Sequence, residues 1–191
     1  MNINKGGIML EIRVHGRGGQ GGVIASKILA YAFAMEGKFV QAFPEFGVER
    51  RGAPVTAFIR ISDSSIKVRS KIYEPQHLIV LEPTLLSAID ITEGLKDGGF
   101  IIINTKRKPD EVSLKKRGSR VATVDATGIA LKYHLGSSAA PIVNTAILGS
   151  FAKATGFVKI ESIISAIKKE VPIKSEENAK AAEEAFNSTI M

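Results

Sequence analysis

A glycine-rich segment near the N-terminus has the residue types and spacing to bind an anion. Residues 16–21, GRGGQG, fit the pattern G-x-G-x-x-G. They stand between a predicted strand at residues 9–15 and a predicted helix at residues 22–36. Glycines at such a turn let the backbone approach a ligand closely, and the N–H groups at a helix start favour negative charge. The spacing therefore predicts a phosphate-binding loop.

Two other interpretations of this segment remain open. Glu45 stands at about the offset of the acid that binds a ribose hydroxyl in dinucleotide folds, which would indicate a nicotinamide cofactor. Against it, Pro44 and a predicted hairpin occupy the place of the crossover helix, and no histidine–acid pair follows to move a proton beside a hydride. Alternatively, the glycines at 18, 19 and 21 only allow close packing against a neighbour. Packing and a non-dinucleotide phosphate site are favoured about equally, both ahead of nicotinamide binding.

A second candidate for anion binding is the turn that carries Arg50 and Arg51, which lie between glycines. Paired guanidinium groups suit a phosphate or a carboxylate because each can bond such a group with two parallel N–H donors. The alternative is an internal ion pair, in which Glu49 or Glu45 holds one of the two arginines. We expect that alternative to be true of one arginine.

The residue types needed for redox or metal chemistry are missing. The chain has no cysteine, so it carries neither a disulfide nor an iron–sulfur cluster with thiolate ligands. Its three histidines, His15, His77 and His134, are far apart and lack metal-ligand spacing. We therefore expect no metal site and no catalytic residue in this chain. His15, beside the glycine loop, is expected to be structural.

The positive charge of the chain raises the question of nucleic acid. The formal net charge is +7 and the pI is about 9.6. Much of the charge lies in residues 106–120, KRKPDEVSLKKRGSR, which hold no aromatic residue that could stack on bases. A solvated, lysine-rich loop and helix is the favoured interpretation, and we expect no nucleic-acid binding. An acidic protein partner is a weaker alternative.

Hydrophobic periodicity indicates one α/β domain at residues 9–191, preceded by a patternless leader at residues 1–8. We expect a mostly parallel sheet with helices on both faces, and an antiparallel hairpin inserted after the second strand. The hairpin is predicted to join residues 55–61 to residues 66–70. The other predicted strands are residues 9–15, 39–43, 77–81, 100–104 and 121–125; the predicted helices are residues 22–36, a short one opened by Pro83, 126–135, 142–155, 160–169 and 176–187.

The sequence offers no sign of export or membrane insertion. The first residues, MNINKGGIML, lack the continuous apolar stretch of a signal peptide. The longest apolar run, about residues 23–35, contains Lys27 and is too short to cross a bilayer. We therefore expect a cytoplasmic protein.

Several segments together resemble a known family. HGRGGQG at residues 15–21 and VQAFPEFGVERRGAP at residues 40–54 are similar to the gamma subunits of pyruvate:ferredoxin oxidoreductase and its branched-chain 2-oxoacid relatives. IYEPQHLIVLEPTLL, GLKDGGFIIINT and PIVNTAILGSFAKATG, which begin at residues 72, 94 and 141, are also similar to that family. The resemblance covers nearly the whole chain after Met9, in order. One small departure is Gly22, where relatives often carry a larger apolar residue.

The resemblance implies a complex of alpha, beta, gamma and delta subunits. The family decarboxylates a 2-oxoacid on thiamine diphosphate with magnesium, passes electrons through iron–sulfur clusters to ferredoxin, and forms an acyl-CoA. This chain has no thiamine diphosphate motif and no cysteine, so it is expected to be a non-catalytic subunit without a cofactor of its own. Pyruvate is the expected substrate of the complex. A 2-oxoisovalerate enzyme and a stand-alone NAD(P)-binding dehydrogenase are the alternatives.

CoA is the phosphate-rich substrate that the resemblance implies, and both anion-binding candidates follow strands at one predicted end of the sheet. We therefore expect CoA phosphates to contact Gly18, Gly19, Gln20, Gly21, Arg50 and Arg51. Asn144 and Thr145, in the family-like NTA-x-LG pattern, either face the cofactor cleft, or cap the helix or bond a neighbouring backbone, the second being favoured. Asp125, between a strand and a helix, is expected to be a capping residue.

Overall fold

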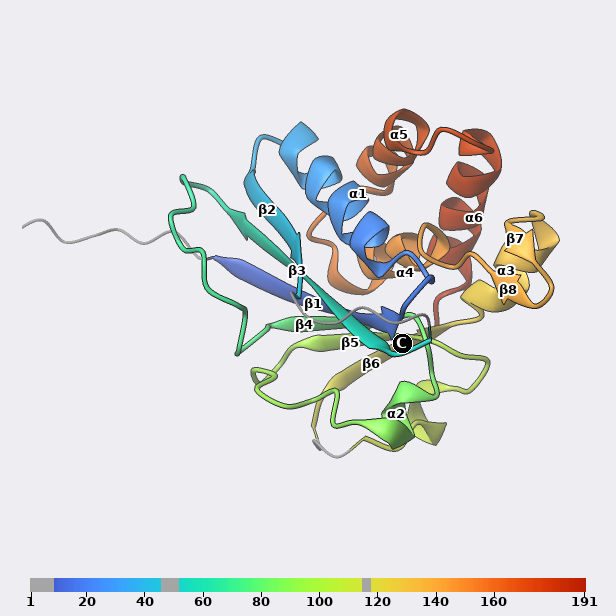
Figure 1. Cartoon of the computed structure of the whole chain (residues 1–191), viewed down its shortest axis with the longest axis horizontal. Coiled ribbons are helices and arrows are strands. Elements are labelled where there is room, and N and C mark those ends of the chain that lie inside the picture. Colours follow the sequence, from blue (N-terminus) through green and yellow to red (C-terminus); the bar gives the residue numbers. More distant parts are fainter. Residues whose placement is uncertain (1–8, 46–51, 115–117) are drawn as a thin grey trace, which may run out of the picture.

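The computed structural model describes residues 9–45, 52–114 and 118–191, and within this part the centre is a six-stranded sheet (Figure 1). The strand order is β2-β3-β1-β4-β5-β6. The strands are β1 (Leu10–Arg17), β2 (Phe39–Pro44), β3 (Pro54–Ser62), β4 (His77–Val80), β5 (Phe100–Asn104) and β6 (Arg120–Val124). β1, β4, β5 and β6 run parallel, and β3 is antiparallel to both of its neighbours. The predicted α/β domain with a mostly parallel sheet is confirmed.

Helices follow most strands, and a short two-stranded ribbon precedes the last three of them. The helices are α1 (Gly22–Met35), α2 (Leu85–Ala88), α3 (Ala126–Lys132), α4 (Ala146–Thr155), α5 (Ile160–Glu170) and α6 (Ser175–Ser188), with a single 3-10 turn, η1 (Pro109–Glu111). The ribbon pairs β7 (Gly136–Ser137) with β8 (Ala140–Pro141). On either side of the ribbon the predicted helix ends are wrong: α3 ends at Lys132 rather than at residue 135, and α4 begins at Ala146 rather than at residue 142.

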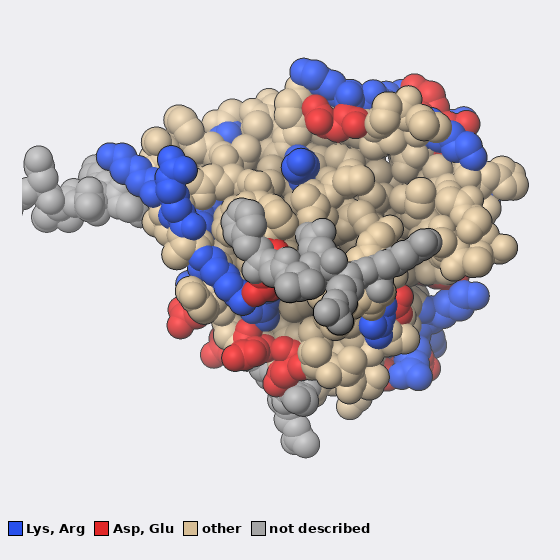
Figure 2. All heavy atoms as spheres, in the orientation of Figure 1, with Lys and Arg blue, Asp and Glu red and all other residues tan. Residues whose placement is uncertain are grey.

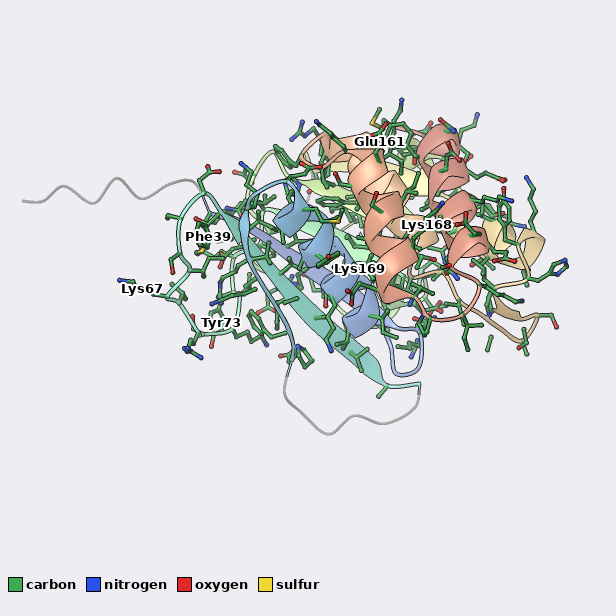
Figure 3. All side chains as sticks on the ribbon, turned by 90° about the horizontal axis from the view of Figure 1, so that it is seen from above. Phe39, Lys67, Tyr73, Glu161, Lys168 and Lys169 are labelled. Carbon is green, nitrogen blue, oxygen red and sulfur yellow. The ribbon has the colours of Figure 1, made fainter. Side chains whose placement is uncertain are left out.

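The prediction that residues 55–61 pair with residues 66–70 is wrong. β3 pairs with β2 along one edge and with β1 along the other, whereas residues 66–70 form no strand. A strand has only two hydrogen-bonding edges, so no edge of β3 is left for residues 66–70. They run as a loop beside the sheet, and Lys67 points away from it (Figure 3). The antiparallel pair next to β1 is therefore β2–β3.

The two faces of the sheet are covered differently. α1, α3, α4, α5 and α6 pack on one face and share a large apolar core with it (Figure 1). α1 is buried along most of its length because it packs on β2 and β3 and against α5, which explains why it is apolar on nearly every side. The other face is covered by α2 and by residues near Ile91 and Leu95 over β4 and β5. Helices on both faces are thus confirmed, although α2 is only one turn long.

Over β1 and β3, the second face of the sheet carries buried charged side chains beside an aromatic pair, Phe43 and Phe58. The Arg60 side chain is 1% exposed, and its Nε donates to Glu11 Oε1 at 2.8 Å. The same guanidinium donates to Ser70 O at 2.6 Å and lies over the Phe43 ring, 5.3 Å from its centroid. Beside this pair, Arg13 donates to the carbonyl of Ile91 at 2.9 Å. Buried cations therefore tie the loops of the second face to the sheet.

Arg60→Ala should lower the free energy of unfolding by about 3 kcal/mol, because truncation leaves the half-buried Glu11 carboxylate without its cation and Ser70 O without a donor. Lys38→Ala is the matched control. It breaks the exposed Lys38–Asp63 ion pair at 2.6 Å and should cost less than about 1 kcal/mol. Urea unfolding of the full chain measures both, and equal costs would contradict the structural role of Arg60.

Candidate functional site

The glycine loop, residues 16–21, lies where the helices that follow two neighbouring strands go to opposite faces of the sheet. α1 follows β1 on one face, and α2 follows the neighbouring parallel strand β4 on the other face (Figure 1). In open α/β sheets, ligands bind outside the carboxyl ends of the strands at such a point. Three segments meet here, residues 16–21, 52–53 and 82–84, and we call them the carboxyl-edge cluster.

Two glycines of the loop are required for different reasons. Gly19 has φ +95° and Gly21 has φ +76°, a left-handed conformation that glycine adopts at little cost. A Cβ on Gly21 would lie 2.4 Å from Asn144 Nδ2, whereas one on Gly19 would meet nothing within 4 Å. Gly21 is therefore needed for close packing, as the packing interpretation of the motif predicts. Gly19 is needed for the turn alone.

Some backbone N–H groups of the glycine loop already donate to carbonyls of the chain. The Gly18 N–H donates to Ala53 O at 2.9 Å, and Gly52 N–H donates back to Gly18 O at 3.2 Å. The Gln20 N–H donates to Arg17 O at 3.0 Å. Two of the N–H groups that we expected to face a phosphate are thus bonded within the protein. Arg50 and Arg51 lie outside the described residues, but the chain that follows them joins the glycine loop directly.

Side-chain hydrogen bonds connect the three segments of the carboxyl-edge cluster. Arg17 donates to Gly52 O at 2.9 Å and to Thr84 Oγ1 at 3.0 Å. Gln20 accepts from the Arg17 N–H at 2.8 Å through its carbonyl and donates to Glu82 Oε2 at 2.8 Å through its amide. Each of the three segments is therefore held to the next by a side chain whose hydrogen bonds are directional.

The sequence analysis missed Arg17, Glu82 and Thr84. The available signal was their position: Glu82 and Thr84 follow β4, a strand correctly predicted to be buried and parallel, so their side chains had to lie at its carboxyl edge. Arg17 occupies a variable position of the glycine motif, which the pattern itself ignores.

The Glu82 carboxylate is stabilised in its charged form. Its partial burial by itself raises the pKa, but the Thr84 backbone N–H, the Gln20 amide and the Arg17 charge act in the opposite direction, and the pKa of Glu82 is lowered. The Thr84 N–H reaches Glu82 Oε1 at 3.2 Å. The cluster thus contains its own anion, whose charge Arg17 partly offsets.

The remaining candidates have structural partners. Asp125 caps α3, as predicted, because its Oδ1 accepts from the Gly128 N–H at 2.8 Å. Thr145 donates to Asn178 Oδ1 at 2.7 Å. His15 is buried, and its Nε2 accepts from Arg13 Nε at 3.0 Å. Burial and the Arg13 charge lower the pKa of His15 to about 3, so this side chain is neutral at pH 7.

Within the described ranges, no group of three or more His, Asp or Glu side chains could hold a metal ion. None of the described helices has the length and apolar character to cross a membrane. On the face drawn in Figure 2, Lys and Arg side chains lie in separate groups interspersed with acidic ones, rather than on one continuous basic surface.

Comparisons with known proteins agree with this architecture. Residues 11–188 match the family described as pyruvate ferredoxin/flavodoxin oxidoreductase. The chain is 59% identical over 186 residues to the pyruvate/ketoisovalerate oxidoreductases common subunit gamma of Thermococcus kodakarensis, covering 96% of this chain and 98% of that one. It also resembles the crystal structure of the pyruvate oxidoreductase subunit PORC of Thermotoga maritima, with a TM-score of 0.78, 37% identity and coverage of 95% and 97%.

A more distant likeness shows the fold alone. The 2-oxoglutarate:ferredoxin oxidoreductase of Magnetococcus marinus, solved with 2-oxoglutarate, coenzyme A and succinyl-CoA bound, has a TM-score of 0.69 and 19% identity. The match covers 94% of this chain and 30% of that one.

The chain belongs to the pyruvate ferredoxin/flavodoxin oxidoreductase family, as its motifs predict. Within that family it is of the gamma-subunit type.

Glu82→Gln should lower the free energy of unfolding at pH 7 by about 1 kcal/mol, since one of the two bonds from Gln20 and Thr84 loses its acceptor in a partly exposed site. The folded pKa is lowered, so the carboxylate contributes fully above about pH 5 and its contribution is lost as the pH falls through that pKa. The difference between the variants should therefore shrink at low pH.

Urea unfolding at pH 7 and at pH 3 tests this, with Glu74→Gln as the control. Glu74 is 73% exposed and its ion pair with Lys96 is 4.0 Å long, so that change should have little effect at either pH. A Glu82→Gln cost that does not depend on pH would contradict the charged network.

Proposed function

We propose that this chain is the non-catalytic gamma subunit of a pyruvate:ferredoxin oxidoreductase complex. The complex converts pyruvate and CoA reversibly to acetyl-CoA and carbon dioxide while reducing ferredoxin. Alpha, beta and delta subunits complete it, and we place it in the cytoplasm. The observation that carries the proposal is the 59% identity, over nearly the whole chain, to a gamma subunit named for these oxidoreductases.

The chemistry of the chain supports a non-catalytic role. It has no cysteine, so the thiolates of any iron–sulfur cluster must come from other subunits. In the carboxyl-edge cluster, the polar side chains of Arg17, Gln20 and Glu82 are engaged with one another or with the backbone. Thiamine diphosphate, magnesium and the clusters are accordingly assigned to the partner subunits.

One gamma chain can serve more than one 2-oxoacid enzyme. The Thermococcus kodakarensis relative is named as common to the pyruvate and ketoisovalerate oxidoreductases. A subunit that does not form the 2-oxoacid pocket is free of that selectivity, so we extend the proposal to a 2-oxoisovalerate enzyme.

We further propose that Arg50 and Arg51 bind phosphates of CoA beside the glycine loop. The support is positional: Gly52 and Ala53, which follow the arginines, are bonded to Gly18, and Arg17 holds Gly52 from the other side. Because the N–H groups of Gly18 and Gln20 already donate to carbonyls of the chain, the arginines make most of the phosphate contacts in this proposal. The backbone N–H groups of Gly19 and Gly21 make the others.

The single chain should have no 2-oxoacid oxidation and no visible absorbance, and ferredoxin reduction should appear when the alpha, beta and delta subunits are added. Titration calorimetry with NAD and NADP, as the control for the dehydrogenase alternative, should give no binding. Turnover by the chain alone would overturn the proposal, and so would a micromolar dissociation constant for either nucleotide, which corresponds to a binding free energy of about −8 kcal/mol.

Arg50→Ala or Arg51→Ala in the assembled enzyme should raise the Michaelis constant for CoA about ten- to a hundredfold, since a charge-assisted bond is worth about 1.5–3 kcal/mol. The constant for pyruvate should stay unchanged. Arg69→Ala, an exposed arginine on the loop after β3, is the matched control and should change neither. If both constants rise, or assembly fails, the arginines are structural.

A further inference from the structure

The main sheet has an open edge along β2. In the described part of the chain, β2 pairs with β3 alone and is the first strand of the sheet (Figure 1). The Glu45 N–H, directly after β2, donates to Thr56 O at 2.8 Å, so residues 43, 41 and 39 are the ones that hydrogen-bond to β3. The N–H and C=O groups of Val40 and Ala42 therefore point away from β3. An edge of this kind can pair with another strand.

The residues on either side of Val40 and Ala42 limit how a strand can pair here. Pro44, the next residue that points outward, has no N–H group. Lys38 already donates its N–H to Phe33 O at 3.1 Å. An added antiparallel strand therefore gains its full set of hydrogen bonds by facing Val40 and Ala42.

The same edge carries an exposed aromatic ring and, further along, a hollow. Phe39, at the start of β2, is 50% exposed. Residues two apart on a strand share a face, so its side chain lies on the same face as Gln41 and Phe43. A cavity of about 310 Å³ lies at the other end of the strand and is lined by Gln41, Ala42, Phe43 and Arg69. The strand thus has an unpacked ring at its start and space for a ring near its end.

A second copy of β2 matches both features when a two-fold axis passes through Gln41. Val40 of each copy then faces Ala42 of the other, and all four outward N–H groups find an acceptor. The same register places Phe39 of one copy opposite Phe43 of the other, at the hollow. Aromatic pairs that face each other across two strands stabilise a sheet.

The other self-pairings lose hydrogen bonds. Val40 opposite Val40 requires the Lys38 N–H, which Phe33 O already binds. Ala42 opposite Ala42 requires an N–H from Pro44, which has none. The chemistry of the strand ends therefore selects the register that also joins the ring to the hollow.

The charges at the ends of β2 favour the antiparallel direction. Lys38 precedes the strand and Glu45 follows it, and the residues between them are uncharged. Antiparallel pairing brings the positive end of each copy beside the negative end of the other, and no charge is buried between the strands. Lys38 and Glu45 are each paired within their own chain, to Asp63 and Lys71, so this effect selects a direction more than it adds affinity.

We propose that two copies of this chain associate through their β2 strands, in the register that places Val40 opposite Ala42, and so join their sheets into one. The contact is a single strand pair with two aromatic contacts. Its area is below about 1,200 Å², which is typical of weak association. The inference concerns the chain itself and does not depend on the proposed function.

Cross-linking through one introduced cysteine tests the register, because the chain has no cysteine of its own. In Gln41→Cys the two thiols face each other across the axis in a non-hydrogen-bonded pair, with about 4.5 Å between Cα atoms, which a disulfide spans. Mild oxidation of the full chain should convert most of this variant to a covalent dimer on a non-reducing gel. Ala42→Cys is the matched control: its two copies lie diagonally, about 7–8 Å apart, and should give little dimer.

Lys67→Cys controls for random collisions, because Lys67 is exposed on the loop beside the same edge and points away from the sheet (Figure 3). Yields are compared after correction for the rate at which each thiol reacts with a soluble thiol reagent. Gln41→Cys should exceed both controls about tenfold. No covalent dimer in Gln41→Cys, or equal yields in the three variants, would overturn the pairing.

Sedimentation velocity of the unaltered chain tests association without a cross-link. At about 1 mM most of the chain should sediment as a dimer, and at about 10 μM as a monomer, as a contact of this size implies. Ala42→Pro removes one outward N–H from each copy and leaves the hydrogen bonds to β3 in place, so it should weaken the dimer about tenfold or more. An unaltered chain that stays monomeric at about 1 mM would overturn the proposal even if that variant does not fold.

Discussion

The placement of β1 between two strands of opposite direction is the constraint on which the carboxyl-edge cluster depends. β3 runs antiparallel along one edge, with Arg17 opposite Pro54, and β4 runs parallel along the other, with His15 opposite Val80. This register brings the start of β3 and the end of β4 to the end of β1. Residues 52–53 and 82–84 therefore meet the glycine loop because of backbone pairing, before any side chain contributes.

The side chains then decide what the glycine loop can do. In a dinucleotide fold the loop leaves its N–H groups for a pyrophosphate, whereas here carbonyls take the N–H groups of Gly18 and Gln20. Glu82 adds a carboxylate to the same cluster. A motif that fits a nucleotide site in its letters thus uses two of its own N–H groups to form a joint between segments of the chain.

Asn144 links this joint to the helical layer. Its side chain occupies the space that a Cβ on Gly21 would need, and the next residue, Thr145, donates to Asn178 of α6. The missing side chain at position 21 therefore serves packing between α1 and the segment before α4. A change at Asn144 would therefore act on the glycine loop and on the segment before α4 together.

The sequence by itself determined the class of fold and the family. Alternating and continuous apolar runs located β4, β5, β6, α1, α5 and α6 to within a residue of their ends, because burial imposes its period on local sequence. The absence of cysteine and the order of the motifs can be read directly from the sequence. Asp125 was recognisable as a cap because a cap bonds within its own turn.

Only the tertiary structure decided which segments meet. Residues 66–70 have the pattern of a strand, yet β1 and β2 fill both edges of β3, and that competition between edges is invisible in local sequence. The Gln20–Glu82 bond spans 62 residues and the Asn144–Gly21 contact spans 123. Such contacts depend on strand register and helix packing, which follow from the whole core rather than from any one segment.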